Sequence, residues 1–505
     1  MSTEVQHKAK SPYGIIAILL AGAFVSLLNS TLLNVALPSM MEDLDVGAST
    51  IQWLATGYML VNGILIPTTA FLIQKYSVRH LFIAAMLLFT IGTIASSMAH
   101  TFPILLLGRM IQASGSAIMM PLLMNVLLVS FPVEKRGGAM GILGLVMIFA
   151  PAVGPTLSGW IVEHYHWRTL FYMIIPIALL VLIFAFFKLK DKKDKNNITI
   201  DAVSLILSSL GFGGILYGFS SAGDKGWDSP HVYLSLIIGF ISLALFIYRQ
   251  FKMKTPMLDF RVYKYSMFSL ASGIAILLNM ALFSAMILMP IYLQQLRGIS
   301  PMDSGLLMLP GAVIMGIMSP ITGKLFDKYG AKALALTGLS ITVATTYFFS
   351  MLSFDTSYPT LLLMYSVRMF GMSMVMMPVM TNGLNQLPAR MNPHGTAMNS
   401  TISQVAGAIG SALLVTVMST RAKAHGEQLM QQELGKLTEQ PTPDMLEQLQ
   451  NQVTGQATLN GINDAFLVAV FIAAGALLLA FFIKRPKPAE QQQGHGLQQL
   501  KEETN

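Results

Sequence analysis

The chain has 505 residues, of which 54% are hydrophobic and only 11% are charged. Soluble domains carry about 25% charged residues, so a chain this apolar needs the lipid bilayer as its solvent. The formal net charge of +8 does not indicate a nucleic-acid partner, because the basic residues lie in short loops between apolar runs. The absence of cysteine excludes disulfides, thiolate catalysis and zinc–cysteine sites, and the nine histidines show no metal-binding spacing.

Apolar runs long enough to span a membrane recur along the whole chain. A helix needs roughly twenty apolar residues to cross the hydrocarbon core. The first run begins at Tyr13 and carries no clear signal-peptidase site, so it predicts an uncleaved helix. In chain order, the fourteen predicted helices cover residues 13–36, 51–73, 81–100, 103–130, 138–162, 168–187, 201–220, 231–249, 267–293, 304–325, 333–353, 357–383, 395–418 and 463–483.

The distribution of positive charge predicts the orientation of these helices. Most of the 32 lysines and arginines fall in alternate loops, and the richest are 188–195 and 249–264. Cytoplasmic loops carry such an excess, which places both termini in the cytoplasm and requires an even number of helices.

The sequence divides into four parts. Residues 1–187 form a predicted six-helix bundle, and residues 188–266 hold two inserted helices between basic linkers. Residues 267–483 form a second six-helix bundle, which includes a long polar outside loop over 420–462 with a short helix over 445–453. The polar tail 484–505 is predicted to be a disordered cytoplasmic segment. Neither polar segment has the features of a catalytic domain.

The chain contains an internal repeat. The sequence RMIQASGSAIMMPLLMN starts at Arg109, and RMFGMSMVMMPVMTN starts at Arg368. Each stretch places Met-Met-Pro after the arginine and an asparagine four residues after the proline, at Asn125 and Asn382. The repeat predicts two related six-helix halves with a site between them, which is a common plan of transporters.

The fifth predicted helix resembles the antiporter signature of the major facilitator superfamily. That family has glycine where this chain has alanine and serine, and both replacements are small enough to preserve close helix packing. Glycine and proline could serve packing alone; the family suggests that they also seal the cavity against proton leak. The residues that carry the resemblance are Gly141, Ala150, Gly154, Pro155, Ser158 and Gly159.

The first predicted helix indicates which group within the superfamily the chain resembles. Its segment LLNSTLLNVALP, residues 27–38, is similar to the signature of the fourteen-helix drug/proton antiporters, and the chain looks closest to their lincomycin-type efflux branch. The resemblance spans nearly the whole chain. It implies an all-α polytopic membrane protein with the major facilitator fold, built of two six-helix bundles plus two extra helices packed at the periphery.

The same resemblance implies a function. It implies a monomeric secondary exporter of lipophilic drugs or antibiotics in a bacterial plasma membrane, which works by alternating access. It implies the proton gradient as the energy source and no cofactor, and nothing in the sequence resembles an ATP-binding loop. An accessory protein is not identified by the sequence.

The loop after the tenth predicted helix resembles the cytoplasmic motif of the superfamily, in which a brace stabilises the outward-facing state. The residues concerned are Gly323, Asp327, Lys328 and Gly330. Asp327 could cap a helix or pair with a cation, and an ordinary positively charged cytoplasmic loop is the simpler alternative. In the first half Gln74 stands where the family has aspartate, so the brace is expected to be stronger in the second half.

The residues that could couple transport to protons depart from the family pattern. The group usually has an acid at the position of Asn29, whose amide cannot titrate. Arg109 is a strong charge deep in a predicted helix, where a charge faces a cavity or a partner unless it reaches an interface. Glu163 and Asp303, near helix ends, are our candidate protonation sites, each with a pKa raised by partial desolvation; the alternative is a surface acid or a helix cap.

A large substrate cavity of mixed polarity is predicted between the halves. Polar residues in apolar helices usually face the bundle interior, and methionine adapts to irregular ligands, although many of the 36 methionines could simply face lipid. Such a cavity suits lipophilic drugs better than sugars or phosphates. Its predicted lining is Asn34, Tyr58, Asn62, Gln112, Met119, Asn279, Phe283, Met286, Tyr292, Met376, Asn399 and Gln404.

Two other readings of the chain remain open at this stage. It could export or flip an endogenous lipid or metabolite, a reading that the missing acid at Asn29 favours. A membrane-embedded enzyme or a channel is less compatible with the sequence, because no nucleophile–base or metal constellation is visible.

Overall fold

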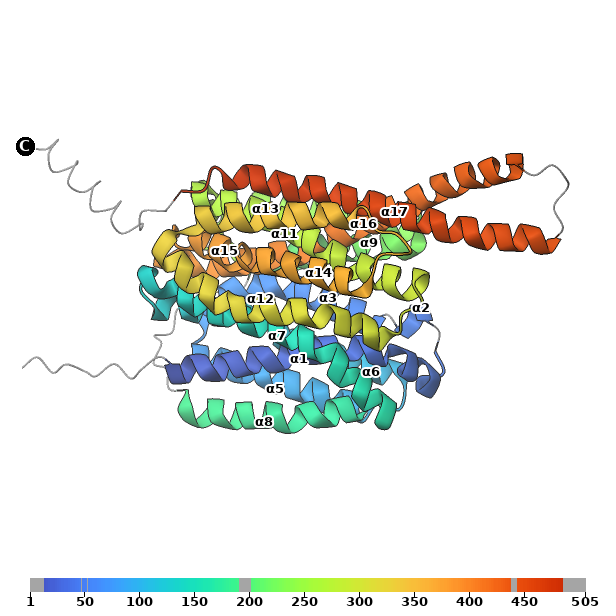
Figure 1. Ribbon diagram of the computed structural model, residues 1–505. Coiled ribbons are helices and arrows are strands. Elements are labelled where there is room, and N and C mark those ends of the chain that lie inside the picture. The colour runs from blue at the N-terminus through green and yellow to red at the C-terminus, as the bar shows by residue number, and fades with distance from the viewer. Residues whose placement is uncertain (1–12, 47, 52, 190–200, 437–442, 485–505) are drawn as a thin grey trace, which may run out of the picture.

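The computed structural model describes residues 13–46, 48–51, 53–189, 201–436 and 443–484, and every regular element within these ranges is a helix (Figure 1). The all-α class predicted from the apolar runs is therefore confirmed. A helix satisfies its own backbone hydrogen bonds, which is why apolar segments of this length adopt it in lipid.

The first bundle is built from the first half of the chain. A short helix, α2 (Ala48–Ile51), precedes its second span, which runs through α3, the 3₁₀ turn η1 and α4. A second short turn, η2 (Val133–Lys135), precedes α7. The main elements are α1 (Tyr13–Leu44), α3 (Trp53–Leu65), η1 (Ile66–Thr68), α4 (Thr69–Lys75), α5 (Val78–Ser97), α6 (Phe102–Ser130), α7 (Arg136–His164) and α8 (Thr169–Lys188).

The two inserted helices are α9 (Ala202–Lys225) and α10 (Pro230–Lys252). They pack against each other, and α9 also contacts α3 of the first bundle and α16 of the second. The indole of Trp53 stacks on Tyr217 of α9 at 5.8 Å between ring centres. In addition, Nε1 of Trp227 donates to the hydroxyl of Thr416 at 2.8 Å. The inserted pair is thus anchored to both bundles.

The second bundle is built from the second half of the chain. Its fourth span is interrupted between Ser373 and Met376 and consists of α14 and α15. Two short turns, η3 (Phe260–Lys264) and η5 (Ala389–Met391), precede α11 and α16. The main elements are α11 (Ser266–Pro290), η4 (Ile291–Leu296), α12 (Pro301–Tyr329), α13 (Ala331–Phe349), α14 (Tyr358–Ser373), α15 (Met376–Leu384), α16 (Asn392–Lys436) and α17 (Pro443–Ala480).

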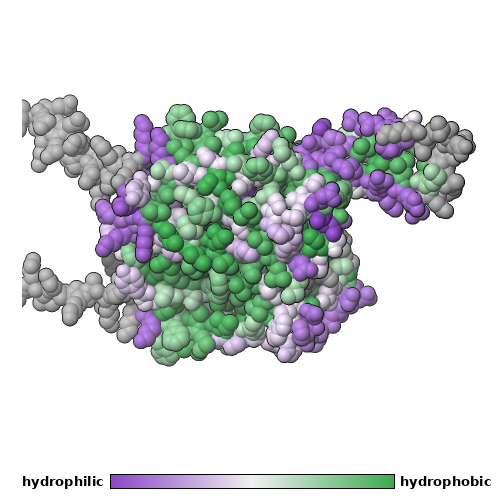
Figure 2. Space-filling view, in the orientation of Figure 1, coloured by the Kyte–Doolittle hydropathy of each residue, from purple (hydrophilic) through white to green (hydrophobic). Residues whose placement is uncertain are grey.

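The helices have the length and surface of a membrane protein. Within the described residues, twelve helical segments are long and apolar enough to cross a bilayer. Helices α7 and α11 are long as well and bring the set to fourteen. Each of the fourteen predicted helices therefore has a counterpart. Figure 2 shows a broad apolar band across the face in view, with polar residues gathered at its two ends. The protein is a multi-pass membrane protein.

The largest difference from the sequence prediction concerns residues 420–462. We predicted a polar loop with one short helix over 445–453, whereas α16 continues to Lys436 and α17 already begins at Pro443. The two helices form a hairpin that projects from the bundle (Figure 1). The first helix also continues beyond the predicted residue 36, to Leu44. The predicted disordered tail lies outside the described residues.

The two ends of the bundle can be named by what they carry. Helix α1 begins and α17 ends at the left of Figure 1, and we call this the termini end. The α16–α17 hairpin projects at the opposite side, the hairpin end.

Candidate functional site

A cavity of about 370 Å³ lies between the two bundles. Helices α1, α3, α6 and α7 line it from the first bundle, and α11, α15 and α16 line it from the second. Its wall is mostly apolar, with many methionines and a few amide and hydroxyl groups. Drug-sized ligands occupy cavities of about this size and composition.

Most of the cavity residues expected from the sequence do line this space. Gln112 and Met119 are instead buried behind the wall, and Tyr292 is buried elsewhere, where its hydroxyl donates to the carbonyl of Ser353 at 2.6 Å. The side chains of Asn34 and Phe283 lie outside what the structure describes. The predicted residues on the wall are Tyr58, Asn62, Asn279, Met286, Met376, Asn399 and Gln404.

The sequence analysis missed the small polar residues of the cavity. Their signal was present, because each is a polar residue in an apolar helix, but such hydroxyls also bond to their own helix. Ser30, for example, donates to the carbonyl of Leu27 at 2.7 Å. The missed residues on the wall are Ser30, Thr31, Ser116, Ser400 and Ser403.

Arg109 of α6 is the charged residue of the cavity wall. Only 1% of its surface is exposed, and its guanidinium carbon lies 4.3 Å from the ring centre of Tyr58. One nitrogen, Nη1, donates to Oε1 of Gln112 at 2.6 Å, and Nε2 of Gln112 donates to the hydroxyl of Thr93 at 2.8 Å. The Nε atom of Arg109 is buried without a hydrogen-bond partner.

Arg368, the counterpart of Arg109 in the repeat, has a different environment. It is completely buried, and its Nη2 donates to the carbonyl of Ala281 at 2.7 Å. Its Nε donates to the hydroxyl of Thr346 at 3.2 Å, so it joins helices within the second bundle. Arg368 is not among the residues that line the cavity.

Asn29, at the position where the family has an acid, is buried close to the cavity wall. Its neighbour Ser30 lines the cavity, whereas Asn29 itself does not. Only 3% of its surface is exposed, and its Nδ2 atom has no hydrogen-bond partner among the described residues.

The acids proposed as protonation sites are solvent-exposed. Glu163 lies in the last turn of α7, and Asp303 lies in the first turn of α12, where its carboxylate accepts a hydrogen bond from Ser300. Exposure does not provide the partial desolvation on which the hypothesis depended. Within the described part of the chain, no aspartate or glutamate is buried.

Two other acids near helix ends, Asp201 and Asp464, form ion pairs. Asp201 caps α9 and makes two short hydrogen bonds with Arg249, which hold the pKa of the Asp201 carboxyl well below its usual range. Asp464 of α17 pairs with Arg421 and His425 of α16, at the base of the projecting hairpin.

The signature of α7 packs against helices of both bundles. A Cβ at Gly141 would lie 2.6 Å from the carbonyl oxygen of Ser319 in α12, and one at Gly154 would overlap Thr31 of α1. The hydroxyl of Ser158 donates to the carbonyl of Leu32 in α1. Ala150 is fully buried and Gly159 half-buried, while the side chain of Pro155 lies outside the described part. The small residues thus permit close approach on two sides of α7.

Asp327 joins the two bundles at the termini end. Its two carboxylate oxygens each accept a backbone hydrogen bond at 2.9 Å, one from Gly137 and one from Gly138. Both glycines lie in the first turn of α7, where free N–H groups and the helix dipole favour a negative charge.

The other residues of the predicted gate loop have separate roles. A Cβ at Gly323 would overlap the carbonyl oxygen of Gly137, so glycine permits the contact of α12 with α7. Gly330 ends α12 with a φ of 81°, a conformation that favours glycine. Lys328 is exposed beside the ring of Tyr329.

The corresponding contact of the first bundle contains no carboxylate. Nε2 of Gln74 in α4 lies 3.0 Å from Nε2 of His394 in α16. His394 is buried, and its Nδ1 accepts a hydrogen bond from the backbone of Asp259 at 3.1 Å. Our sequence analysis did not identify His394 as a residue of this contact. Together with the bond from Arg136 to Asn385, these contacts close the termini end between the bundles, and we call them the seam.

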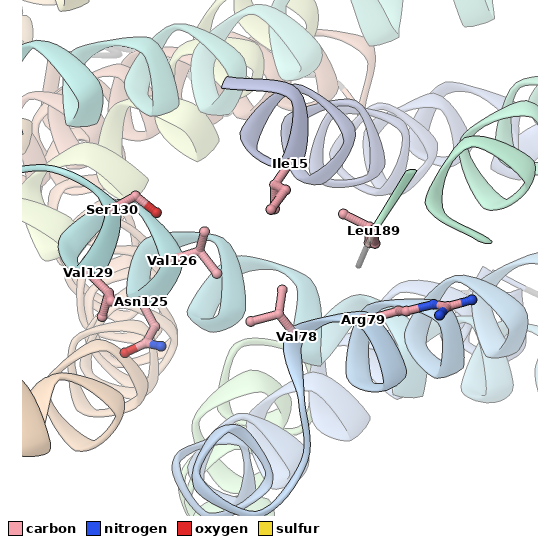
Figure 3. Close-up of a pocket in the computed structure, with 8 residues that line it drawn as sticks. All are labelled: Ile15, Val78, Arg79, Asn125, Val126, Val129, Ser130 and Leu189. Atoms are coloured by element: carbon pink, nitrogen blue, oxygen red, sulfur yellow. The ribbon is translucent and has the colours of Figure 1, made fainter. Parts of the chain in front are cut away.

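A second cavity, of about 200 Å³, lies within the first bundle near its termini end (Figure 3). It is lined from α1, α5 and α6 and by Leu189 after α8. The guanidinium of Arg79 extends away from the apolar residues in this view, and it donates to the carbonyl of Phe186. This cavity does not reach the second bundle and therefore lacks the position of a transport site.

Comparison with known proteins agrees with this architecture. The family model described as "Major Facilitator Superfamily" matches residues 19–411. The chain is 47% identical to the uncharacterized MFS-type transporter YhcA of Bacillus subtilis, over 96% of this chain and 95% of that protein. It is 41% identical to the lincomycin resistance protein LmrB of Listeria monocytogenes, over 94% and 98% of the two chains. The solved structure of the proton:xylose symporter XylE is similar in fold, with a TM-score of 0.60 at 12% identity, over 92% of this chain and 95% of that one.

Proposed function

The chain belongs to the Major Facilitator Superfamily, and we propose that it exports lipophilic drugs or antibiotics in exchange for protons. It is a membrane transporter and not an enzyme. The relative named for lincomycin resistance, which aligns with nearly the whole chain, supports a drug as the substrate. The resemblance of the first and fifth helices to drug/proton antiporters supports proton exchange.

The observation that carries the proposal is the cavity of about 370 Å³ between the bundles. Its methionines provide an adaptable apolar surface, and its amide and hydroxyl groups provide scattered hydrogen bonds. In this proposal Tyr58, Asn62, Asn279, Asn399 and Gln404 contact the substrate. Gln112 and Met119 support the wall from behind.

We assign the structure to an outward-facing state. The excess of lysine and arginine in loops at the termini end supports a cytoplasmic location for that end, in a bacterial plasma membrane. The contacts of Asp327 and Gln74 hold the bundles together there. Export then requires the bundles to rock apart at this end, so that the cavity opens alternately to the two sides.

The proposal is tested with purified protein in liposomes and radiolabelled lincomycin. With an acidic lumen and a neutral exterior, proton exit is expected to drive accumulation of lincomycin in the lumen. Vesicles with equal pH on both sides should only equilibrate the drug. Because a weak base is trapped by protonation in an acidic lumen, protein-free vesicles incubated to equilibrium set the level of trapping, and accumulation with the protein should exceed it. Accumulation that does not depend on the pH difference would contradict proton exchange.

The absence of any lincomycin transport would favour the alternative function, movement of an endogenous lipid or metabolite. In that case the same vesicles would be assayed for translocation of a fluorescent phospholipid.

A further inference from the structure

The described residues of the cavity wall carry a single charge, which is positive. Tyrosine, asparagine, glutamine, serine, threonine and apolar residues line it together with one arginine, Arg109, and none of these described residues is aspartate or glutamate. Nor is any acid buried elsewhere in the described part of the chain. From the described residues, a substrate in this cavity therefore meets one fixed positive charge and no fixed negative charge.

The guanidinium of Arg109 has N–H donors that are not used in hydrogen bonds to the protein. Gln112 occupies one N–H group of the guanidinium, and Tyr58 covers one of its faces. The Nε–H group is buried without a partner. A guanidinium offers five N–H donors and cannot lose its charge in a protein, so an acceptor brought into the cavity would complete the hydrogen bonding of Arg109.

Burial makes this charge important for the choice of ligand. A charged group removed from water is costly unless it is paired, and attraction between opposite charges is strong where water is excluded. An anionic ligand would compensate Arg109, whereas a cationic ligand would add a second unpaired charge of the same sign. The partial negative face of the Tyr58 ring stabilises the guanidinium but provides no full counter-charge.

We infer that the cavity selects amphiphiles by charge, and that it prefers anions to neutral molecules and neutral molecules to cations. The inference rests on the proposed export function and adds the substrate class. The preferred ligand has an apolar body, which contacts Met59, Met120 and Met376, and a carboxylate, phenolate or similar acceptor, which binds Arg109. A weakly basic drug such as lincomycin would be recognised in its uncharged form.

The test is a binding measurement with three matched fluorescent probes on the full-length protein in nanodiscs. All three contain a dansyl group on the same alkyl chain, which ends in a carboxylate, in a methyl ester or in a trimethylammonium group. The carboxylate is expected to bind about thirtyfold more tightly than the trimethylammonium compound, since one close charge pair in a desolvated site contributes at least about 2 kcal/mol. Equal affinities for the two charged probes would overturn the inference.

Substitution of Arg109 locates the selectivity. Arg109→Gln should remove most of the difference between the charged probes while the affinity for the ester changes little. The matched control is Arg368→Gln, which removes the equivalent buried arginine of the other bundle, away from the cavity wall. It should leave the ratio of affinities intact. An intact ratio in Arg109→Gln would also overturn the inference.

A second variant keeps the test decisive if Arg109→Gln fails to fold. Asn399→Asp places a carboxylate on the cavity wall, where Asn399 now contacts the sulfur of Met380. It should raise the affinity for the trimethylammonium probe and lower that for the carboxylate probe. No change in either affinity would contradict the inferred control by wall charge.

The outcomes separate this inference from the proposed function. Lincomycin transport driven by a pH difference, together with equal binding of all probes, would leave the function standing and remove the substrate class. Charge-selective binding without such transport would support the inferred charge preference and contradict the proposed drug export. Displacement of the carboxylate probe by a drug-like acid, but not by phosphatidylglycerol, would assign the anion to a soluble amphiphile and not to a membrane lipid.

Discussion

At the scale of single residues, Asp43 shows how an ion pair fixes the hairpin end of the first bundle. Asp43 lies near the end of α1, beyond its membrane-spanning part. Its carboxylate accepts hydrogen bonds from Arg168 at 2.7 Å, from Trp167 at 3.1 Å and from His166 at 3.3 Å. Arg168 also donates to the carbonyl of Ala99, so one cluster joins the end of α1 to the segment that follows α5 and to the residues that precede α8.

The Asp43 cluster predicts acid sensitivity. Partial desolvation raises the pKa of the Asp43 carboxyl, but the hydrogen bonds lower it by more, to below its ordinary value of 3.8. A depressed pKa stabilises the fold above the unfolded value and loses this effect as the pH falls through the folded value. Asp43→Asn should therefore lower the melting temperature at pH 7, and the difference from the wild type should shrink as the pH falls below about 4.

The melting temperatures would be measured in detergent from pH 7 to pH 3. Because the side chain of Asp43 is one-third exposed, the effect at neutral pH should be only about 0.2–1 kcal/mol. Glu42→Gln, a change at an exposed neighbour, is the control and should have no such pH dependence. A constant difference between Asp43→Asn and wild type across the range would contradict the assignment.

The sequence was sufficient to identify polar residues near the cavity. It was not sufficient to distinguish residues that line the cavity from residues that are buried behind the lining. Asn62, Asn279 and Gln112 all interrupt apolar helices, and only the structure shows that Gln112 turns to Arg109 and Thr93. Residues that line the cavity and residues buried behind them follow the same helical periodicity in the sequence. His394 was missed for a related reason: its partners, Gln74 and the backbone of Asp259, are distant in the chain.

At the scale of elements, hydropathy correctly predicted which segments form helices, but it did not predict where the helices end. An apolar run predicts where a helix is in lipid, but a polar segment rich in glutamine, glutamate and lysine continues the helix into water. Helices α16 and α17 do so, and they pack against each other where we predicted a loop. The internal repeat was more informative, since it predicted the relation of α6 to the α14–α15 span.

The contact between α7 and α12 gives a prediction about the transport cycle. Gly323→Ala places a methyl group against the carbonyl of Gly137 and should destabilise the closed termini end by about 1–3 kcal/mol. The population should shift toward the inward-facing state. Gly316→Ala on the same helix is a matched control, because a Cβ there meets no atom within 4 Å.

Accessibility of a single cysteine measures this shift. The chain has no cysteine, so Ser400→Cys introduces a unique thiol on the cavity wall. A membrane-impermeant maleimide added at the termini end should label it faster in the Gly323→Ala background than in the Gly316→Ala background. Equal rates would show that the α7–α12 contact does not limit opening.

At the scale of the whole molecule, the fold is two bundles with a cavity between them and a seam that closes one end. Hydrogen bonds within each bundle, such as those of Asp43 and Arg368, hold it as a unit. The side-chain hydrogen bonds across the seam come chiefly from Asp327, Arg136 and Gln74, and α7 also packs closely on α12 through small residues. Hydrogen bonds of this kind can be exchanged during a cycle, whereas the packed interior of a bundle cannot be.

This difference predicts that a link across the seam stops transport without removing the binding site. Gln74→Cys and His394→Cys, combined in one chain, place two thiols where the side chains now approach to 3.0 Å. A short reversible bis-thiosulfonate should join them and abolish the accumulation of lincomycin driven by a pH difference. Reduction should restore it, and binding of the dansyl carboxylate probe should persist throughout, because the cavity residues are unchanged.

A link within one bundle is the control. Leu352→Cys and Asn463→Cys lie in the second bundle, where Asn463 now bonds to the backbone of Leu352. Joining this pair should leave transport running, since the bundle moves as one unit. Continued transport by the protein linked across the seam would mean that the termini end need not open. Loss of transport in both linked proteins would mean that motion within a bundle, and not rocking of one bundle against the other, drives the cycle.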